Sequence, residues 1–507
     1  MIEKIVRKIL QAEVYDIADQ TPLTPAPLLS RRLNNSIYIK REDLQPVFSF
    51  KLRGAYNKMA QLDHCSRDKG VIAASAGNHA QGVAMSATRL GISALIVMPK
   101  TTPEIKVNAV QQLGAKTILH GDSYDEACQH ALVLAEQSSR TFIHAYDDID
   151  VIAGQGTIGM EILNQKSASI DAIFVPVGGG GLISGIASYV KFVRPDIKII
   201  GVEPDNADSM GQAMKTGHRV VLEQVGLFAD GVAVRQAGKQ TFAIANKLVD
   251  EMISVTTDEI CAAIKDIFDE TRAIAEPAGA LAVAGLKNYV DARSVNNQCL
   301  IAINSGANTN FDRLRYVAER AELGEHKEAL LAVTIPEQPG SFLEFCTLIG
   351  AHSVTEFNYR YFHSVDAQVF VGIAISAEND ARQNIIQQFS QAGLSAIDMT
   401  ENELAKEHIR YMVGGHMPDI HNERIFSIEF PERPGALLDF LTVLNKRWNI
   451  SLFHYRNHGA AFGRVLLGMQ IEEQDSAVFS SCMDKLGYRY TEETENTAYI
   501  LFAGNQR

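Results

Sequence analysis

The stretch Ala172-Ile-Phe-Val-Pro-Val-Gly-Gly-Gly-Gly-Leu-Ile183 decides the fold of this chain. Its first six residues form an apolar run, which is typical of a strand buried on both faces of a parallel sheet. Four glycines follow, and after them Ile183 to Val193 has the pattern of a helix. Consecutive glycines let backbone N–H groups surround a phosphate at the positive end of a helix. A flexible linker is the alternative, but both flanks are strongly patterned, and the run lacks the Gly-x-Gly-x-x-Gly spacing of a dinucleotide site.

Strand-like and helix-like segments alternate on both sides of this stretch, from Ser36 to Asn310. The strand-like runs are residues 37–40, 71–74, 95–98, 117–119, 172–177, 198–202 and 300–303, and the helix-like segments include 80–90, 104–113, 124–137 and 183–193. This alternation predicts βαβ units and a mostly parallel sheet covered by helices on both faces. Functional residues are therefore expected in the loops beyond the carboxyl ends of the strands.

Composition and charge favour a folded protein that acts on small molecules. The 507 residues predict about three domains, one large and two small, and 46% of them are hydrophobic. A net charge of -13 without blocks of like charge argues against a nucleic-acid or membrane surface. The six cysteines contain no Cys-x-x-Cys pair, so we expect neither a disulfide framework nor a zinc site. This cysteine usage is typical of a protein in the reducing cytoplasm. The first 19 residues predict an amphipathic helix, with Ile2, Ile5, Val6, Ile9 and Leu10 on one side, and no signal peptide.

After about residue 325 the chain repeats itself. Ile335-Pro-Glu-Gln-Pro-Gly340 returns as Phe430-Pro-Glu-Arg-Pro-Gly435, and the aromatic run Glu356 to Arg360 returns as Leu452 to Arg456. In each copy a strand-like run comes before the Pro-Gly turn and a helix-like segment after it; these are residues 330–335 and 341–349, then 425–430 and 436–444. Strand, turn, helix and strand recur in order, which favours two related βαβ-type subdomains over a chance likeness of two turns.

Lys51 is the first candidate for chemistry, in the run Ser49-Phe-Lys-Leu-Arg-Gly-Ala55. It stands at the start of a helical pattern that continues to Gln61. The positive end of that helix, together with burial beside Phe50, would lower the pKa of the lysine. A neutral amine is what a Schiff base with an aldehyde cofactor requires. Taken alone, a lysine near a helix start is more often an ordinary surface residue.

Two further loops follow predicted strands. Ser75-Ala-Gly-Asn-His-Ala-Gln-Gly82 lies between the strand ending near Ala74 and a helix expected from about Ala80. Its small residues let N–H groups converge on a carboxylate, and Asn78 adds an amide donor. Asn304-Ser-Gly-Ala-Asn308 ends another strand and places the hydroxyl of Ser305 at the ligand edge of the sheet. An ordinary capped turn would explain either loop by itself.

Taken together and in this order, the four motifs resemble the fold-type II pyridoxal-phosphate enzymes, over roughly residues 20 to 320. Lys40-Arg-Glu-Asp43 and Glu276-Pro-Ala-Gly-Ala280 bring the likeness closest to the serine/threonine dehydratases. The C-terminal repeat resembles the ACT-like regulatory halves of the biosynthetic threonine dehydratases. The resemblance implies an α/β catalytic domain over residues 1–322, followed by an α+β regulatory domain of two ACT-like subdomains over residues 328–402 and 423–496.

The resemblance also implies a role for each motif. Lys51 would hold the pyridoxal phosphate and serve as the catalytic base, Phe50 would pack against the ring, and Ser305 would face the pyridine nitrogen. The phosphate would be bound by Gly178, Gly179, Gly180, Gly181 and Leu182. The substrate carboxylate would be bound by the loop of Ser75, Ala76, Gly77, Asn78 and His79. Asn78 would also bond the ring hydroxyl. A hydroxyl at the ring nitrogen need not keep it protonated, which favours β-elimination over transamination.

The activity so implied is that of a lyase, which converts L-threonine into 2-oxobutanoate and ammonia as the first step of isoleucine biosynthesis. Isoleucine would inhibit it, valine would antagonise isoleucine, and the protein would be a cytoplasmic homotetramer. Tyr359 and Tyr455 occupy equivalent positions in the two repeats and are candidate effector residues, although half-buried strand aromatics are the plain alternative. The remaining alternatives are a serine dehydratase or racemase, a β-replacing synthase, and a non-catalytic amino-acid sensor.

No metal site is predicted. Relatives in the serine racemase and dehydratase group hold a divalent cation with a Glu, a backbone carbonyl and an Asp. In this chain Glu203 and Ala207 fit that pattern, but Ser209 occupies the third position.

Overall fold

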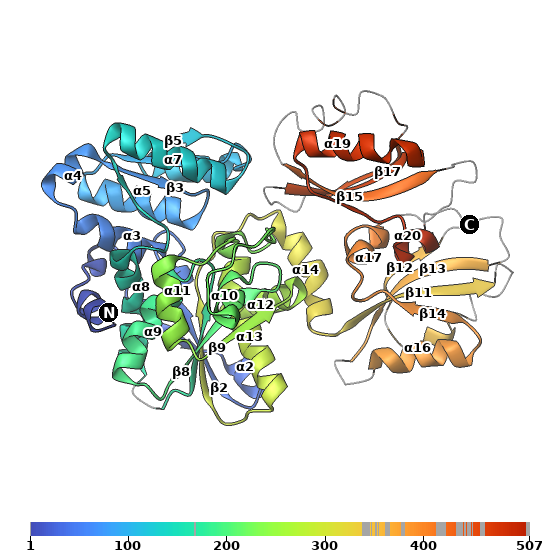
Figure 1. Ribbon diagram of the computed structural model, residues 1–507. Coiled ribbons are helices and arrows are strands. Elements are labelled where there is room, and N and C mark those ends of the chain that lie inside the picture. The colour runs from blue at the N-terminus through green and yellow to red at the C-terminus, as the bar shows by residue number, and fades with distance from the viewer. Residues whose placement is uncertain are drawn as a thin grey trace. The chain divides into compact units, whose positions relative to one another are not determined.

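The computed structural model describes residues 2–166, 169–336, 345, 347–349, 352, 354–359, 366–376, 381–411, 422–431, 440, 443, 448, 450–456 and 462–502. The chain divides into two compact units, Met1–Ala321 and Glu322–Arg507. Both are seen in Figure 1. Of the helices that the structure describes, none has both the length and the apolar character needed to cross a membrane.

The first unit contains two sheets. The larger has the order β1-β2-β10-β7-β8-β9 and the smaller β5-β4-β3-β6. All ladders are parallel except that between β1 and β2. The strands are β1 Leu23–Pro25, β2 Ser36–Arg41, β3 Val71–Ala74, β4 Ala94–Met98, β5 Lys116–Leu119, β6 Thr141–Phe142, β7 Ala172–Pro176, β8 Lys198–Pro204, β9 Glu251–Val255 and β10 Cys299–Asn304.

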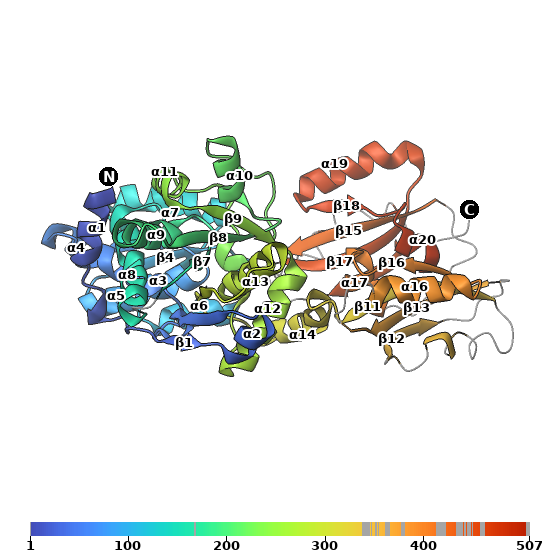
Figure 2. The same ribbon diagram turned by 90° about the horizontal axis from the view of Figure 1, so that it is seen from below.

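Helices cover both faces of the larger sheet, as predicted. Alternate residues of β7 enter different cores: Phe174 packs into one together with α13, and Ile173 and Val175 pack into another together with α9. Helices α1, α8 and α9 lie side by side (Figure 2). The helices of this unit are α1 Ile2–Leu10, α2 Pro27–Arg32, α3 Lys51–Ala60, α4 His64–Lys69, α5 Asn78–Leu90, α6 Glu104–Gln112, α7 Tyr124–Ser138, α8 Ile149–Gln165, α9 Gly181–Val193, α10 Ser209–Thr216, α11 Lys239–Leu248, α12 Thr257–Thr271, α13 Pro277–Arg293 and α14 Arg313–Gly324, with short 3-10 turns η1 Val14–Asp16, η2 Glu42–Leu44 and η3 Asp230–Val232.

The predicted strands are all present, and the differences lie at short elements and helix ends. Strands β1 and β6 span only three and two residues, and β9 at the sheet edge begins with a glutamate, so none carries a clear strand pattern. Helix α5 begins at Asn78 and α9 at Gly181, two residues before the predicted starts, so the last residues of each loop already have helical backbone. In α1, Ile5, Val6 and Ile9 are buried as expected, but Leu10 is 61% exposed.

The second unit contains two four-stranded sheets with matching orders, β12-β13-β11-β14 and β16-β17-β15-β18. Their ladders are antiparallel: β13 lies between β11 and β12, so the predicted βαβ repeat is a split one. The strands are β11 Glu328–Pro336, β12 Val354–Tyr359, β13 Asp366–Ala374, β14 Ser395–Asp398, β15 Glu423–Pro431, β16 Ile450–Arg456, β17 Phe462–Gln470 and β18 Tyr490–Glu492. The helices include α16 Ala381–Gln391, α17 Glu403–Glu407, α19 Ser476–Leu486 and α20 Thr497–Phe502.

The repeat is also visible in the packing of this unit. Phe345 and Phe440, ninety-five positions apart, are fully buried in the cores of the first and second sheet respectively. A third cluster, to which Phe370, Ile425 and Leu466 belong, packs residues of both sheets together. The helix-like segments expected at 341–349 and 436–444 lie largely outside the described residues.

Candidate active site

Lys51 is the first residue of α3, directly after Phe50. Its Nζ lies 3.2 Å from the carbonyl oxygen of Ala145 and 5.2 Å from the centroid of the Phe50 ring. Helix α5 passes close by, since a Cβ on Gly82 would lie 3.2 Å from the backbone of Lys51. Burial lowers the pKa of Lys51 to about 8, although the charge of Glu276 opposes this shift. The amine is thus largely neutral in mildly alkaline solution, as the sequence predicted.

The end of β10 lies beside the lysine loop. The backbone N–H of Phe50 donates to the carbonyl of Ser305 at 3.2 Å, and Ser49 forms an isolated bridge with Gly306. The hydroxyl of Ser305 makes only a long contact, 3.4 Å, with the carbonyl oxygen of Ala278. In the part of the chain that the structure describes, the buried side chains of Ser49 and Asn304 have no hydrogen-bond partner. Polar groups are therefore available here for a ligand.

The four glycines form a tight turn between β7 and α9. Gly180 has a φ of +92°, and a Cβ on Gly179 would lie 2.3 Å from the ring of Tyr146. Residues with side chains do not fit this turn, and the first N–H groups of α9 have no partners within the helix. Because Tyr146 follows Ala145, the contact of Lys51 with Ala145 also brings the lysine to the glycine turn.

Asn78 begins α5 and belongs to a chain of side-chain contacts. Its amide donates to Oε1 of Glu276 at 2.7 Å, and its carbonyl oxygen accepts from Asn308 at 2.7 Å. In the same loop the hydroxyl of Ser75 accepts from the N–H of Gly77 at 3.2 Å. The loops after β3 and β10 are thus joined directly.

His79 is tied to the protein backbone. Its Nε2 lies 2.8 Å from the carbonyl oxygen of Ile143, and the side chain is buried. Burial, together with the charge of Lys51, lowers the pKa of His79 to about 3. The ring is therefore neutral and donates from Nε2, which fixes the loop and leaves its backbone for ligand binding.

Glu276 is the first residue of the motif Glu276-Pro-Ala-Gly-Ala280, for which the sequence suggested no role in the site. It stands directly before α13, yet its carboxylate makes no capping bond to that helix and is turned toward Asn78. Burial and the charge of Asp230 raise the pKa of Glu276 to about 7. An acidic residue before a proline at a helix start is also an ordinary helix beginning, so the only signal in the sequence was ambiguous.

Glu203, which fits the cation-binding pattern of those relatives, is hydrogen-bonded within the protein. The carboxylate of Glu203 accepts from the backbone N–H groups of Met210 and Gly211, at 2.9 and 2.8 Å, at the start of α10. Burial raises the pKa of Glu203 to about 8. Among the described residues there is no group of three or more His, Cys, Asp or Glu side chains that could hold a metal ion.

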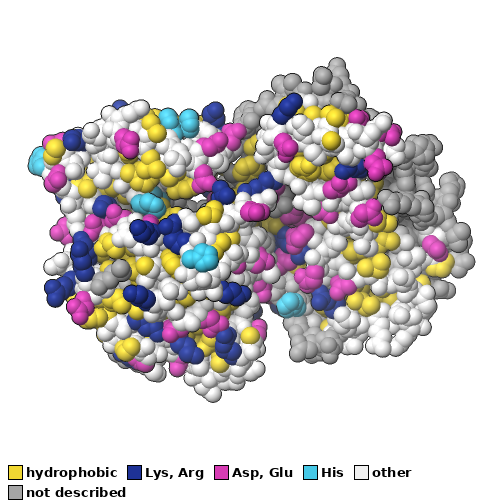
Figure 3. Space-filling view, viewed as in Figure 1, with side chains coloured by type: hydrophobic (Ala, Val, Ile, Leu, Met, Phe, Trp, Pro, Cys, Tyr) yellow, Lys and Arg dark blue, Asp and Glu magenta, His cyan; other side chains and the backbone are white. Residues whose placement is uncertain are grey.

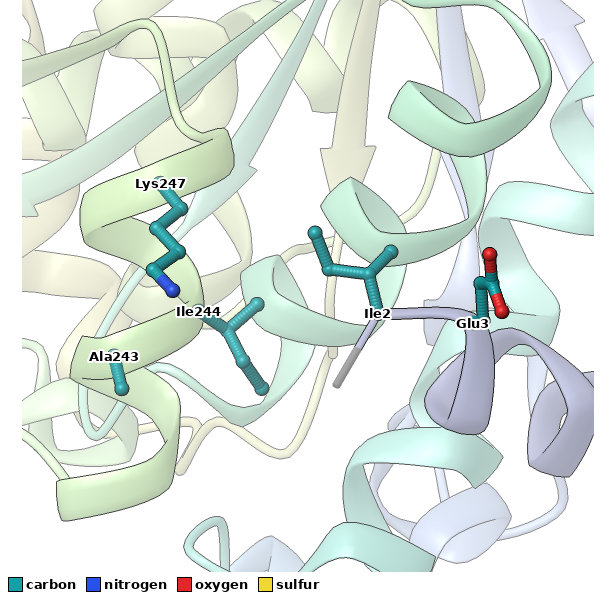
Figure 4. Close-up of a pocket in the computed structure, with 5 residues that line it drawn as sticks. All are labelled: Ile2, Glu3, Ala243, Ile244 and Lys247. Atoms are coloured by element: carbon teal, nitrogen blue, oxygen red, sulfur yellow. The ribbon is translucent and has the colours of Figure 1, made fainter.

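A separate crevice lies between α1 and α11 and has a volume of about 270 Å³. Figure 4 shows its lining, which consists of Ile2, Glu3, Ala243, Ile244 and Lys247. None of the predicted site residues belongs to it.

On the face shown in Figure 3, Lys and Arg side chains are interspersed with Asp and Glu side chains.

The buried lysine, the glycine turn and the polar ends of β3 and β10 lie next to one another, at the place where the sequence predicts a pyridoxal-phosphate site. Residues 14–306 match the family of pyridoxal-phosphate dependent enzymes, which is the class of protein that this fold and site define. Residues 319–409 and 415–502 match the C-terminal regulatory domain of threonine dehydratase.

Individual relatives narrow the class to one family. The chain is 54% identical to the biosynthetic L-threonine dehydratase of Burkholderia multivorans over 98% of both chains. It is 50% identical to that of Escherichia coli over 98% of this chain and 96% of the relative. The solved structure of processed threonine deaminase isoform 2 from Solanum lycopersicum covers 63% of this chain and 93% of its own, with 52% identity and a TM-score of 0.62. The chain belongs to the biosynthetic L-threonine dehydratase family.

Proposed function

We propose that this protein is a lyase that converts L-threonine into 2-oxobutanoate and ammonia, at the start of isoleucine synthesis. One observation carries the proposal: a buried lysine of lowered pKa contacts the residue beside a glycine turn, in a chain of this family. The test is 2-oxobutanoate formation from L-threonine alone. A β-replacing synthase would need a second substrate, a racemase would yield D-amino acid, and a sensor would yield no product.

The residues fit pyridoxal phosphate. Lys51 would bind its aldehyde carbon, and Phe50 would pack against the ring. Ser305 would face the ring nitrogen, and Asn78 would hydrogen-bond the ring hydroxyl. The turn Gly178 to Leu182 offers N–H groups at the positive end of α9 for the phosphate. When bound, the cofactor withdraws electrons from the α-carbon of an attached amino acid.

The chain's own residues then act on the substrate. The loop Ser75 to His79, at the N-terminus of α5, would hold the carboxylate of threonine with backbone N–H groups. The amine of Lys51 removes the proton from the α-carbon as a general base, for which a pKa of about 8 suits neutral pH. The β-hydroxyl leaves as water, and a later hydrolysis takes up one water and releases ammonia, so the sum is 2-oxobutanoate plus ammonia.

Gly179→Ala should weaken the binding of pyridoxal phosphate at least about tenfold, because overpacking costs roughly 1–3 kcal/mol. The new methyl group would lie 2.3 Å from the Tyr146 ring, so the turn has to shift. The measurement is an absorbance titration of cofactor-free protein with the cofactor. Gln137→Ala is the control, because Gln137 is exposed on α7 and belongs to none of the proposed site loops. Equal affinities of the two variants would refute phosphate binding by this turn.

We further propose that the second unit binds isoleucine as inhibitor and valine as its antagonist, in a cytoplasmic homotetramer. The regulatory-domain match supports a small-molecule effector. Tyr359 pairs with Val369 in one sheet and Tyr455 with Val465 in the other, so the two tyrosines hold equivalent backbone positions. Their side chains lie outside the described residues.

Tyr359→Ala or Tyr455→Ala should weaken isoleucine binding at least about fivefold, a change of roughly 1 kcal/mol. An aromatic side chain supplies most of the apolar contact in a small effector site. Calorimetric titration of the full-length protein measures this. Tyr189→Ala, in the catalytic unit, should bind isoleucine as the wild type does. Unchanged affinity in both tyrosine variants would exclude these residues as effector ligands.

A further inference from the structure

The short turn η3 packs directly against Glu276. A Cβ on Gly231 would lie 2.9 Å from the Cβ of Ala278 and 3.5 Å from Oε1 of Glu276. Asp230, the preceding residue, carries two ion pairs: Nζ of Lys106 lies 2.8 Å from its carboxylate, and Nη1 of Arg313 lies 3.4 Å away. We call Lys106, Asp230 and Arg313 the Asp230 cluster.

The Asp230 cluster joins three parts of the catalytic unit. Lys106 belongs to α6, which packs with the smaller sheet; Asp230 belongs to η3; and Arg313 is the first residue of α14, the helix along which the chain leaves this unit. The side chain of Arg313 is 5% exposed, that of Lys106 18% and that of Asp230 40%, so water reaches the carboxylate of Asp230 more than it reaches its two partners. The two cations therefore act on a neighbouring buried carboxylate with little screening, and the anion of Asp230 acts on it with more.

That neighbour is Glu276, which in turn contacts the proposed cofactor and substrate residues. Its Oε1 accepts from the amide of Asn78 at 2.7 Å. Its charge also reaches Lys51, whose ammonium form it favours. Asp230, which is paired with Lys106, is followed by Gly231, whose backbone runs close to Glu276, and Glu276 is hydrogen-bonded to Asn78.

We propose that the Asp230 cluster positions Glu276, and through it the amide of Asn78, so that Lys106, Asp230 and Arg313 serve the reaction without touching the substrate. The inference rests on the proposed dehydratase function. It adds three positioning residues, none of which belongs to the four motifs that define the site.

The charges around Glu276 fix the direction of the expected effects. Burial raises the pKa of Glu276 to about 7; the charge of Asp230 contributes to this rise, while the amide of Asn78 and the charges of Lys106 and Arg313 oppose it. The ionised carboxylate accepts firmly from Asn78, whereas the protonated acid is itself a donor and does so less well. Loss of Asp230 should therefore extend the ionised form to lower pH, and loss of Lys106 should confine it to higher pH.

The test compares Asp230→Asn with Lys106→Met in the full-length, cofactor-loaded protein. The quantity is the pKa of the acid limb of kcat/KM for L-threonine, with the pH dependence of cofactor absorbance in the absence of threonine as a second readout. The limb should move to lower pH in Asp230→Asn and to higher pH in Lys106→Met, each by about half a unit or more. Lys106→Arg should restore the wild-type profile, and the exposed controls Asp291→Asn and Lys69→Met should not move it.

Opposite shifts would support the proposal, since a purely structural defect has no reason to change sign with the charge removed. Unmoved limbs, or shifts in the same direction, would overturn it. If Lys106→Met does not fold, Arg313→Gln replaces it, with the same predicted direction. A wild-type protein inert toward threonine would defeat the proposed function, but the absorbance titration would still decide whether the cluster controls Glu276.

Discussion

Lys51→Ala lowers the turnover of L-threonine at least about 10³-fold, because one side chain both anchors the cofactor and removes the α-proton. General-base catalysis alone contributes about 10²–10⁴-fold, and the loss of the anchor adds to this. The measurement is the rate of 2-oxobutanoate formation at saturating cofactor.

The control is Lys69→Ala, since Lys69 is exposed on α4 and has no place in the site. That variant should keep the wild-type rate. If Lys51→Ala retained more than about a tenth of the activity, another group would have to be the base, and the account of this site would be wrong.

Arg53→Met should destabilise the protein by about 3–5 kcal/mol, the usual cost of leaving a buried charge without its partner. Arg53 is fully buried two residues after Lys51, and its guanidinium bonds both Glu42, at 2.8 and 2.9 Å, and Glu161, at 2.6 Å. In the variant, Glu161 would still have a direct ion pair with Lys40, whose Nζ lies 2.5 Å from its carboxylate. The carboxylate of Glu42 would be left with Thr21 and Gln45 as its hydrogen-bonding partners.

Urea unfolding followed by fluorescence or circular dichroism measures this change. Arg31→Met is the matched control, because Arg31 is exposed on α2, and it should alter stability by less than about 0.5 kcal/mol. A loss below about 1 kcal/mol in Arg53→Met would mean that Glu42 finds other compensation, and that this ion network does not fix α3.

The main lines of the fold could be read from periodicity. The apolar run of β7 is followed by the glycine turn and then by the helical pattern of α9. The other longer strands of this unit are likewise apolar runs that alternate with helical patterns. Strands β1 and β6 escaped prediction because two or three residues cannot show a period. In the second unit, the repeated sequence indicated two related subdomains, but the placing of β13 between β11 and β12 depends on long-range pairing that no local pattern encodes.

The site could be predicted as motifs but not as an arrangement. Each of Lys51, Asn78 and Ser305 stood in a conspicuous loop, and their proposed roles came from resemblance. No local sequence pattern showed that Glu276 would accept a hydrogen bond from Asn78. Nor did any pattern show that Asp230 would pair with two cations, Lys106 and Arg313. Such contacts join residues about two hundred positions apart or come from otherwise ordinary turns, so only the folded chain reveals them.

The dehydratase activity is tested by the stoichiometry of products from L-threonine with purified, cofactor-loaded protein, in the presence and absence of isoleucine. We expect equal amounts of 2-oxobutanoate and ammonia, with no second substrate, and a rate that isoleucine lowers. A protein that binds pyridoxal phosphate but forms neither product from L-threonine would contradict this expectation.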